Sequence, residues 1–216
     1  MVHPQIYIFD LDGTLVDAYP AIVRSFNGCM SAFGYPVQKE GRIRSAVGWG
    51  DKNLLKPFVP PGRLARVLAC YRQRHARDLK GGVSWMPHAR GLLGELKRKG
   101  AKLAVASNRP TRFTRIIIGC LGAERLFDRV LCADRLRFGK PHPLILREIL
   151  KGFGAAPKDA VYIGDMAIDV QTGRRAGVTT AAIATGSSTL KELKREKPDY
   201  LFSDLGQFKK GFCLKP

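Results

Sequence analysis

The chain has no uninterrupted apolar run approaching the roughly 18 residues that a helix needs to cross a bilayer. Its first residues, MVHPQIYIFDLDG, lack the basic start and apolar stretch of a secretory signal. We therefore expect no membrane span and no export, and we expect a cytoplasmic location. Cysteine is scarce as well. The five cysteines form no CxxC pair, and an odd number cannot close completely into disulfides, so reduced thiols are expected.

Acidic residues are few beside basic ones. The chain has 18 Asp and Glu against 37 Lys and Arg, a formal charge of +19, which raises the hypothesis of a nucleic-acid partner. Residues 17–85 hold 12 basic and 4 acidic residues and the remainder holds 25 and 14, so the excess is spread along the chain. No zinc-finger or RNA-binding signature accompanies it. A nucleic-acid partner is therefore not favoured, and a positive field would also attract small anions such as phosphate esters.

The 216 residues fit one ordinary domain with a modest insertion. Residues 6–9 are apolar and end at an Asp-rich turn, which predicts a buried strand. Residues 18–80 show helical periodicity interrupted by glycines and prolines, with no convincing strand. From Pro87 onward, helical segments alternate with five strand segments: KLAVAS, RVLCAD, AVYIGD, TTAAIAT and YLF.

This alternation predicts the α/β class, with a Rossmann-like parallel sheet covered by helices on both faces. The helical stretch is then a cap inserted after the first strand. We expect a catalytic core formed by residues 1–16 and 84–216, and a helical cap formed by residues 17–83.

Four segments of the predicted core contain polar residues with a shared chemistry. FDLDGT places Asp10 and Asp12 after the first strand, with both carboxylates turned to the same side. ASNRP places Ser107 and Asn108 after the KLAVA strand, where a hydroxyl and backbone N–H groups suit phosphate oxygens. FGKPHP contributes Lys140. Since ligands of such folds bind beyond the carboxyl ends of the strands, these segments are expected to converge.

IGDMAID adds Asp165 at a strand end and Asp169 four residues later, which on a helix start places both carboxylates on one face. Any one of these aspartates is as well explained by a turn or a helix cap. Together they crowd four carboxylates at one sheet edge, and such carboxylates repel unless a cation joins them. A hard divalent ion with oxygen ligands fits, above all Mg²⁺, and Lys140 adds a charge that can hold a phosphate.

In this order, FDLDGT, the Ser-Asn pair, the GKP lysine and GDxxxD resemble the haloacid dehalogenase-like (HAD) superfamily. The helical insertion resembles the C1-type cap of that family. Two stretches, SNRPTRFT and FGKPHP, are similar to phosphoglycolate phosphatases. Where that subfamily usually has lysine this chain has Arg109, so a cationic role can survive the change.

The resemblance implies a role for each motif residue. Asp10 would attack phosphorus and form an aspartyl phosphate, and Asp12 would protonate the leaving oxygen and then activate water. Ser107, Asn108 and Lys140 would hold the transferring phosphoryl group. This agrees with the residue chemistry, since phosphoryl transfer depends on positioning and electrostatic stabilisation.

The metal ligands implied by the resemblance are Asp10, Asp165 and the backbone carbonyl of Asp12, with Asp169 supporting the metal shell or Lys140. Within the cap, GRIRSAVGWGDKN offers Arg44 and Trp49 as candidates for substrate contact, against a cap-surface arginine and a cap-core tryptophan. The basic helix expected from Arg63 to Lys80 is interpreted as a solvated helix face. Its His75 shows no metal-ligand pattern.

The leading functional prediction is a Mg²⁺-dependent phosphatase acting on a small phosphorylated metabolite, with phosphoglycolate as the best single substrate. A β-phosphoglucomutase-like phosphomutase and a nucleotide or pyrophosphate phosphatase are rivals on the same core. A dehalogenase is disfavoured, because Asp12 and the complete set of metal-binding acids suit phosphoryl chemistry. A basic nucleic-acid-binding protein is the alternative of another class. The sequence leaves the oligomeric state open.

Overall fold

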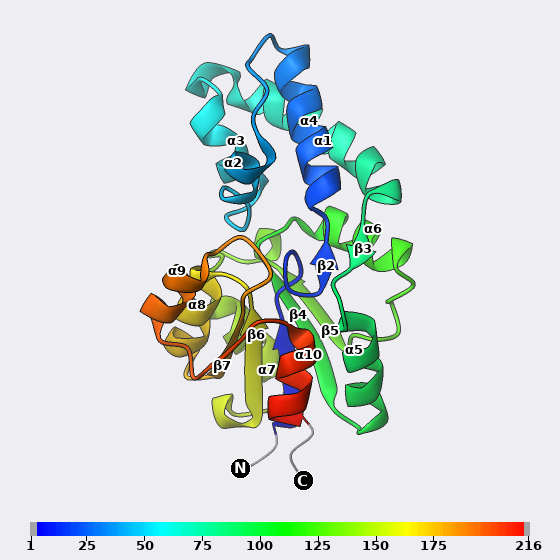
Figure 1. Ribbon diagram of the computed structural model, residues 1–216, viewed down its shortest axis with the longest axis vertical. Helices are drawn as coiled ribbons and strands as arrows, with labels where there is room; N and C mark the ends of the chain where they lie inside the picture. Colours follow the sequence, from blue (N-terminus) through cyan, green and yellow to red (C-terminus); the bar gives the residue numbers. More distant parts are fainter. Residues whose placement is uncertain (1–3, 214–216) are drawn as a thin grey trace.

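A six-stranded parallel sheet forms the centre of the larger part of the molecule, in the order β5-β4-β1-β6-β7-β8 (Figure 1). The computed structural model of the chain describes residues 4–213. The strands are β1 (Ile6–Phe9), β4 (Lys102–Ser107), β5 (Arg129–Cys132), β6 (Ala160–Gly164), β7 (Thr179–Ile183) and β8 (Tyr200–Phe202). Every neighbouring pair is parallel. The predicted α/β class is confirmed.

Helices cover both faces of this sheet because the central strands are apolar on both sides. In β1, Tyr7 and Phe9 pack on one face with α5 (Ala89–Arg98), α6 (Thr111–Cys120) and α10 (Leu205–Phe208). Ile6 and Ile8 pack on the other face with α7 (Leu144–Phe153) and α8 (Ala167–Ala176). A continuous apolar strand is typical of a parallel sheet buried on both faces. Helix α9 (Leu190–Glu196) packs beside α8 through Leu193 and Val170.

A helical insertion, called the cap below, lies between β2 (Val16–Asp17) and β3 (Ser84–Trp85), which pair antiparallel beneath it (Figure 1). Its helices are α1 (Tyr19–Ala32), α2 (Glu40–Arg44), α3 (Asp51–Leu55) and α4 (Leu64–Asp78). The predicted cap limits, residues 17 and 83, fall at this two-stranded ribbon. The Asp17 carboxylate accepts a hydrogen bond of 3.1 Å from the Tyr19 N–H and so holds the start of α1.

The remaining elements are single turns: 3₁₀ segments at Lys56–Phe58, Pro61–Arg63, Leu79–Gly81, Ala133–Arg135 and Pro157–Asp159, and a π-helical turn at Lys209–Cys213. No helix within residues 4–213 has the length and apolarity that a membrane crossing requires. Four cysteines are free thiols: Cys29, Cys70, Cys120 and Cys132.

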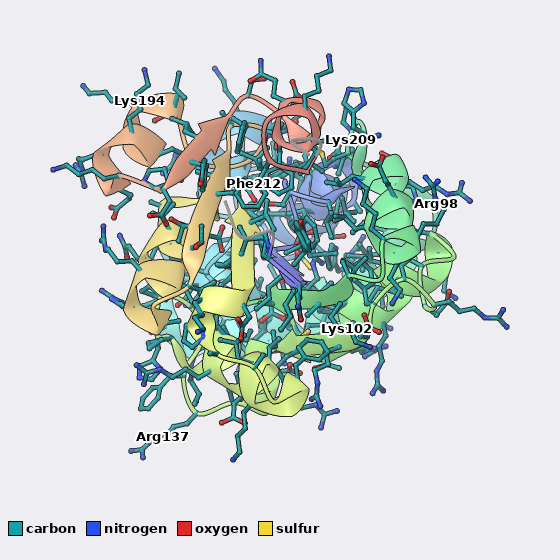
Figure 2. The ribbon with its side chains drawn as sticks, turned by 90° about the horizontal axis from the view of Figure 1, so that it is seen from below. Arg98, Lys102, Arg137, Lys194, Lys209 and Phe212 are labelled. Carbon is teal, nitrogen blue, oxygen red and sulfur yellow. The ribbon has the colours of Figure 1, made fainter. Side chains whose placement is uncertain are left out.

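The basic side chains are distributed around the molecule. Figure 2 looks at the sheet from below and shows Arg98, Arg137 and Lys194 extending outward on different sides of that view. They belong to α5, to the segment after β5 and to α9. The positive charge therefore does not gather in one arm, in keeping with its even spread along the sequence.

Candidate active site

Three central strands bring the predicted motif residues to one edge. β1 pairs with β4 on one side and with β6 on the other, all parallel, so Asp10, Ser107 and Asp165 lie where these strands end. The turn after β1 needs Gly13, which has a φ of +82°. A Cβ on Gly13 would lie 2.7 Å from Asp165 Oδ2, so a larger residue would collide with the carboxylate.

Lys140 binds two of the carboxylates at this edge. Its Nζ donates to Asp10 Oδ1 and to Asp169 Oδ1, each at 2.7 Å, and to the Tyr162 hydroxyl at 3.1 Å. Tyr162 in turn donates to Asp169 Oδ1 at 2.7 Å. Burial disfavours the charged ammonium, yet Asp10 and Asp169 keep the pKa of Lys140 above its ordinary range. The lysine is therefore a fixed positive charge beside Asp10.

One oxygen each from Asp10, Asp165 and Asp169 lies within 4.8 Å of the others, and all three residues are buried. Asp165 accepts from the Thr14 hydroxyl at 2.8 Å and from the Ser187 N–H at 2.9 Å. Burial raises the pKa of Asp10 to about 7, with Lys140 opposing this shift. Burial, and then the charges of Asp10 and Asp169, raise the pKa of Asp165 well above its ordinary value.

Three ionised carboxylates beside one lysine leave a surplus of negative charge at this edge. An all-oxygen donor set with surplus negative charge fits a hard divalent cation such as Mg²⁺. Asp169 is the least available of the three, because Lys140 and Tyr162 occupy its Oδ1 and the Met166 N–H occupies its Oδ2 at 3.0 Å. This arrangement agrees with a supporting rather than a ligating position for Asp169.

The Asp12 side chain lies apart from this cluster. Its Oδ2 accepts from Arg109 Nε and its Oδ1 from Arg109 Nη2, both at 2.7 Å, a bidentate ion pair. The third nitrogen of the guanidinium, Nη1, lies 2.6 Å from Nε2 of His75 in cap helix α4. The two aspartates of FDLDGT thus have different partners, and Asp12 is connected to the cap through Arg109.

Ser107 and Asn108 lie in the loop that follows β4. The Ser107 hydroxyl accepts from the Arg109 N–H at 3.1 Å. The Asn108 side chain bridges two backbones: its Oδ1 accepts from the Lys140 N–H at 2.8 Å, and its Nδ2 donates to the Gly48 carbonyl of the cap at 2.9 Å. Since the Asn108 amide is occupied in this way, its side chain holds the Lys140 loop and the cap in place.

A cleft of about 500 Å³, a volume that includes space open to solvent, lies between the cap and the sheet edge. The core lines it with Asp10, Asp12, Ser107, Asn108, Arg109, Pro110 and Phe113, and the cap with Ile22, Val47, Gly48, Gly50, Asp51, Leu54, Tyr71 and His75. Among these residues Arg109 carries the only positive charge on a side chain. The cationic side chain among the described lining residues therefore comes from the core and not from the cap.

The two cap candidates lie outside this lining. The Arg44 guanidinium stacks 3.8 Å from the centre of the Tyr19 ring and reaches Glu40 at 3.4 Å. Trp49 is 45% exposed, and it is the flanking Gly48 and Gly50 that face the cleft. The structure thus brings together Asp10, Ser107, Lys140, Asp165 and Asp169 and places Asp12 with Arg109 beside them. Substrate contact by Arg44 and Trp49 stays a prediction.

His75 is a cleft residue that sequence reasoning set aside, because it shows no metal-ligand pattern. A sequence signal for it exists, because Val67, Tyr71 and His75 recur every four residues and form one buried stripe on α4. The many charged residues of that helix favoured a solvated face, and the buried stripe was therefore not predicted.

Comparison with known proteins places these features in a family. The model of the haloacid dehalogenase-like hydrolases matches residues 7–183. A phosphoglycolate phosphatase of Haemophilus influenzae is 28% identical over 211 residues, 92% of this chain and 94% of that protein. Pyrophosphatase PpaX of Oceanobacillus iheyensis is 26% identical, over 92% of each chain. The crystal structure of a predicted phosphoglycolate phosphatase from Haemophilus somnus 129pt superposes with a TM-score of 0.91 at 25% identity, covering 97% of this chain and 98% of that one.

Proposed function

The chain belongs to the haloacid dehalogenase-like hydrolases and is a phosphatase, and from that premise we propose that it hydrolyses a small phosphomonoester through an aspartyl phosphate on Asp10, with Mg²⁺ as its metal. The observation that carries the proposal is the separation of the two aspartates of FDLDGT. Asp10 lies in the lysine-bound carboxylate cluster, and Asp12 faces the cleft outside it. A cytoplasmic location is part of the proposal.

Asp10 is suited to the nucleophilic role. Lys140 occupies its Oδ1, and no group among residues 4–213 donates a side-chain or backbone hydrogen bond to its Oδ2. Asp10 lines the cleft, so this second oxygen is available to a phosphorus atom held there. The Lys140 charge lies 2.7 Å from Oδ1 of Asp10 and would attract the phosphoryl oxygens as the new bond forms.

Mg²⁺, bound by Asp10, Asp165 and the Asp12 carbonyl, would neutralise the carboxylates and the charge of the transferring group. Asp169 would support this shell by holding Lys140. The Ser107 hydroxyl and the backbone of the 107–109 loop would donate to the phosphoryl oxygens. Asp12, at the cleft, would deliver a proton to the leaving oxygen and later remove one from the water that hydrolyses the aspartyl phosphate.

Arg109 supports a substrate with a second anionic group. Among the described residues that line the cleft it is the only cationic side chain, and its fork-shaped edge matches a carboxylate. Phosphoglycolate carries a carboxylate beside its phosphate and is our best single substrate. Pyrophosphate is a second candidate, because its second phosphate would meet the same guanidinium and a relative with that activity in its name is 26% identical.

A phosphate-release assay tests this function. The enzyme is offered phosphoglycolate, ethyl phosphate, p-nitrophenyl phosphate and pyrophosphate, each with Mg²⁺ and with a chelator. We expect Mg²⁺-dependent release with phosphoglycolate preferred over ethyl phosphate, and its loss in Asp165→Asn, which keeps the side-chain size and removes a ligand charge. Full activity in chelator or in Asp165→Asn would remove the metal assignment. Release from none of the esters would remove the proposed substrate class.

A further inference from the structure

A chain of hydrogen bonds runs from the cap to Asp12. Because a guanidinium can only donate, Arg109 Nη1 donates to His75 Nε2 at 2.6 Å, which leaves the ring proton of a neutral imidazole on Nδ1. Nδ1 then donates to the Ser25 hydroxyl oxygen at 3.0 Å. Ser25 donates onward to the Asp78 carboxylate at 2.8 Å or the Ala21 carbonyl at 2.6 Å. Each donor in the chain has an acceptor, so the network fixes one tautomer of His75.

His75 belongs to the cap, and its ring is tightly packed where the cap meets the core. It has no exposed surface, Tyr71 stacks on it at 5.0 Å between ring centres, and Phe113 of the core meets it edge-on at 5.0 Å. Burial, and then the charge of Arg109, lower the pKa of His75 to about 2, so it stays neutral. A neutral acceptor with a fixed ring plane sets the plane of the guanidinium that it binds.

The bidentate pair also has a cost for catalysis. Arg109 donates to both oxygens of Asp12, so a proton carried on either oxygen would compete with one of these hydrogen bonds. The same edge of the guanidinium, Nε and Nη2, is the edge on which a substrate carboxylate or phosphate would bind. Asp12 and the second anionic group of the substrate therefore compete for one site.

We propose that His75 is a positioning residue that holds the Arg109 guanidinium from the cap side, so that an anionic group of the substrate replaces Asp12 on its other edge and releases Asp12 for proton transfer. The inference rests on the proposed function. It links recognition of the second anion to the acid–base step, and it explains why a cap residue is joined to Arg109. His75 itself touches neither the phosphoryl group nor the leaving oxygen.

His75→Phe removes the acceptor and keeps a ring between Tyr71 and Phe113, while the matched variant His75→Gln keeps an acceptor. The measured quantity is the ratio of kcat/KM for phosphoglycolate to that for ethyl phosphate, which lacks the carboxylate. Hydrogen bonds to charged groups support an expected fall in this ratio of about tenfold in His75→Phe. His75→Gln is expected to restore most of it. Ser25→Ala, which removes the acceptor of the ring proton, should lower the ratio by less.

A double-mutant cycle separates positioning from general support of the cap. Arg109→Met should abolish the preference for phosphoglycolate, and adding His75→Phe to it should leave the ratio unchanged, because His75 acts through Arg109. An equal loss on both esters in His75→Phe, or additive losses in the cycle, would overturn the inference while leaving the phosphatase intact. A wild-type enzyme that hydrolyses neither ester would instead overturn the proposed function, and the inference with it.

Discussion

Asp10 and Asp12 stand two positions apart in FDLDGT and have opposite surroundings. Asp10 is packed with Asp165 and Asp169 around a single lysine, and burial raises its pKa to about 7. Asp12 faces a cleft, where one arginine matches its charge with two hydrogen bonds. The contrast teaches that residue type alone does not set the chemistry. The sheet edge surrounds Asp10 with carboxylates that require a cation, whereas on the cap side Asp12 is bound by an arginine from which it can be released.

Replacing each aspartate with asparagine gives the largest expected contrast. Asp10→Asn removes the nucleophile and should reduce hydrolysis of every ester to background. Asp12→Asn should reduce kcat/KM for phosphoglycolate by about 10²–10⁴-fold, since an acid–base group contributes on that order. The loss on p-nitrophenyl phosphate should be smaller, because that leaving group needs little protonation. Equal losses on both esters in Asp12→Asn would contradict the acid role.

The two cations should differ in their contribution to stability. Lys140→Met leaves buried carboxylates without their partner and should cost about 3–5 kcal/mol in the free energy of unfolding. Arg109→Met leaves a carboxylate that faces the cleft, and the expected cost is about 1–3 kcal/mol.

The matched control is Lys97→Met, which breaks a surface pair with Asp128 and should cost about 1 kcal/mol or less. Urea denaturation with a chelator present compares the three variants. A cost for Lys140→Met no greater than that of Lys97→Met would show that the buried cluster does not depend on its lysine.

The carboxylate cluster should make the metal-free protein less stable as pH rises. Between the ordinary Asp value of 3.8 and about 7, folded Asp10 keeps a proton that the unfolded chain releases, so stability falls across this window. With a chelator, the melting temperature should therefore be higher at pH 5 than at pH 8. Mg²⁺ should raise it more at pH 8, where its carboxylate ligands are ionised. Asp165→Asn should flatten both trends, and a uniform effect of Mg²⁺ at the two pH values would contradict them.

His75 should have the opposite pH effect. Below the ordinary histidine pKa of 6.5, His75 takes up a proton in the unfolded chain, whereas in the folded protein its pKa is about 2 and it stays neutral. Stability therefore falls as pH falls. The difference in unfolding free energy between wild type and His75→Phe should change by up to about 1.4 kcal/mol per pH unit below 6.5. Urea denaturation at pH 7 and pH 5 measures it. A constant difference would mean that His75 is not held neutral.

The sheet edge could be predicted from sequence because parallel topology decides it. Strands with continuous apolar runs must lie in one sheet, and their carboxyl ends then meet, so the positions of Asp10, Ser107 and Asp165 followed from strand patterns. The same reasoning brought Lys140 and Asp169 to this edge, and the resemblance to a known family added a role for each. Neither argument needed the placement of the cap.

The cap side could not be predicted, because it depends on how the cap packs against the core. Arg44 stacks on the Tyr19 ring and reaches Glu40, contacts that the sequence did not indicate, and its contact with substrate stays a prediction. His75 was hidden in a basic helix, and only its contact with Arg109 reveals a connection to Asp12. Asn108 lies at the predicted place but joins backbones with its side chain.

The division of labour between the two aspartates is tested most directly by locating the phosphoryl group on the enzyme. Asp12→Asn is incubated with p-nitrophenyl phosphate and Mg²⁺, quenched in acid, digested and analysed by mass spectrometry. Because attack would persist while hydrolysis of the acyl phosphate is slowed, we predict that a phosphoryl group accumulates on Asp10. Continued release of p-nitrophenolate from Asp12→Asn with the phosphoryl group found on another residue would contradict the account.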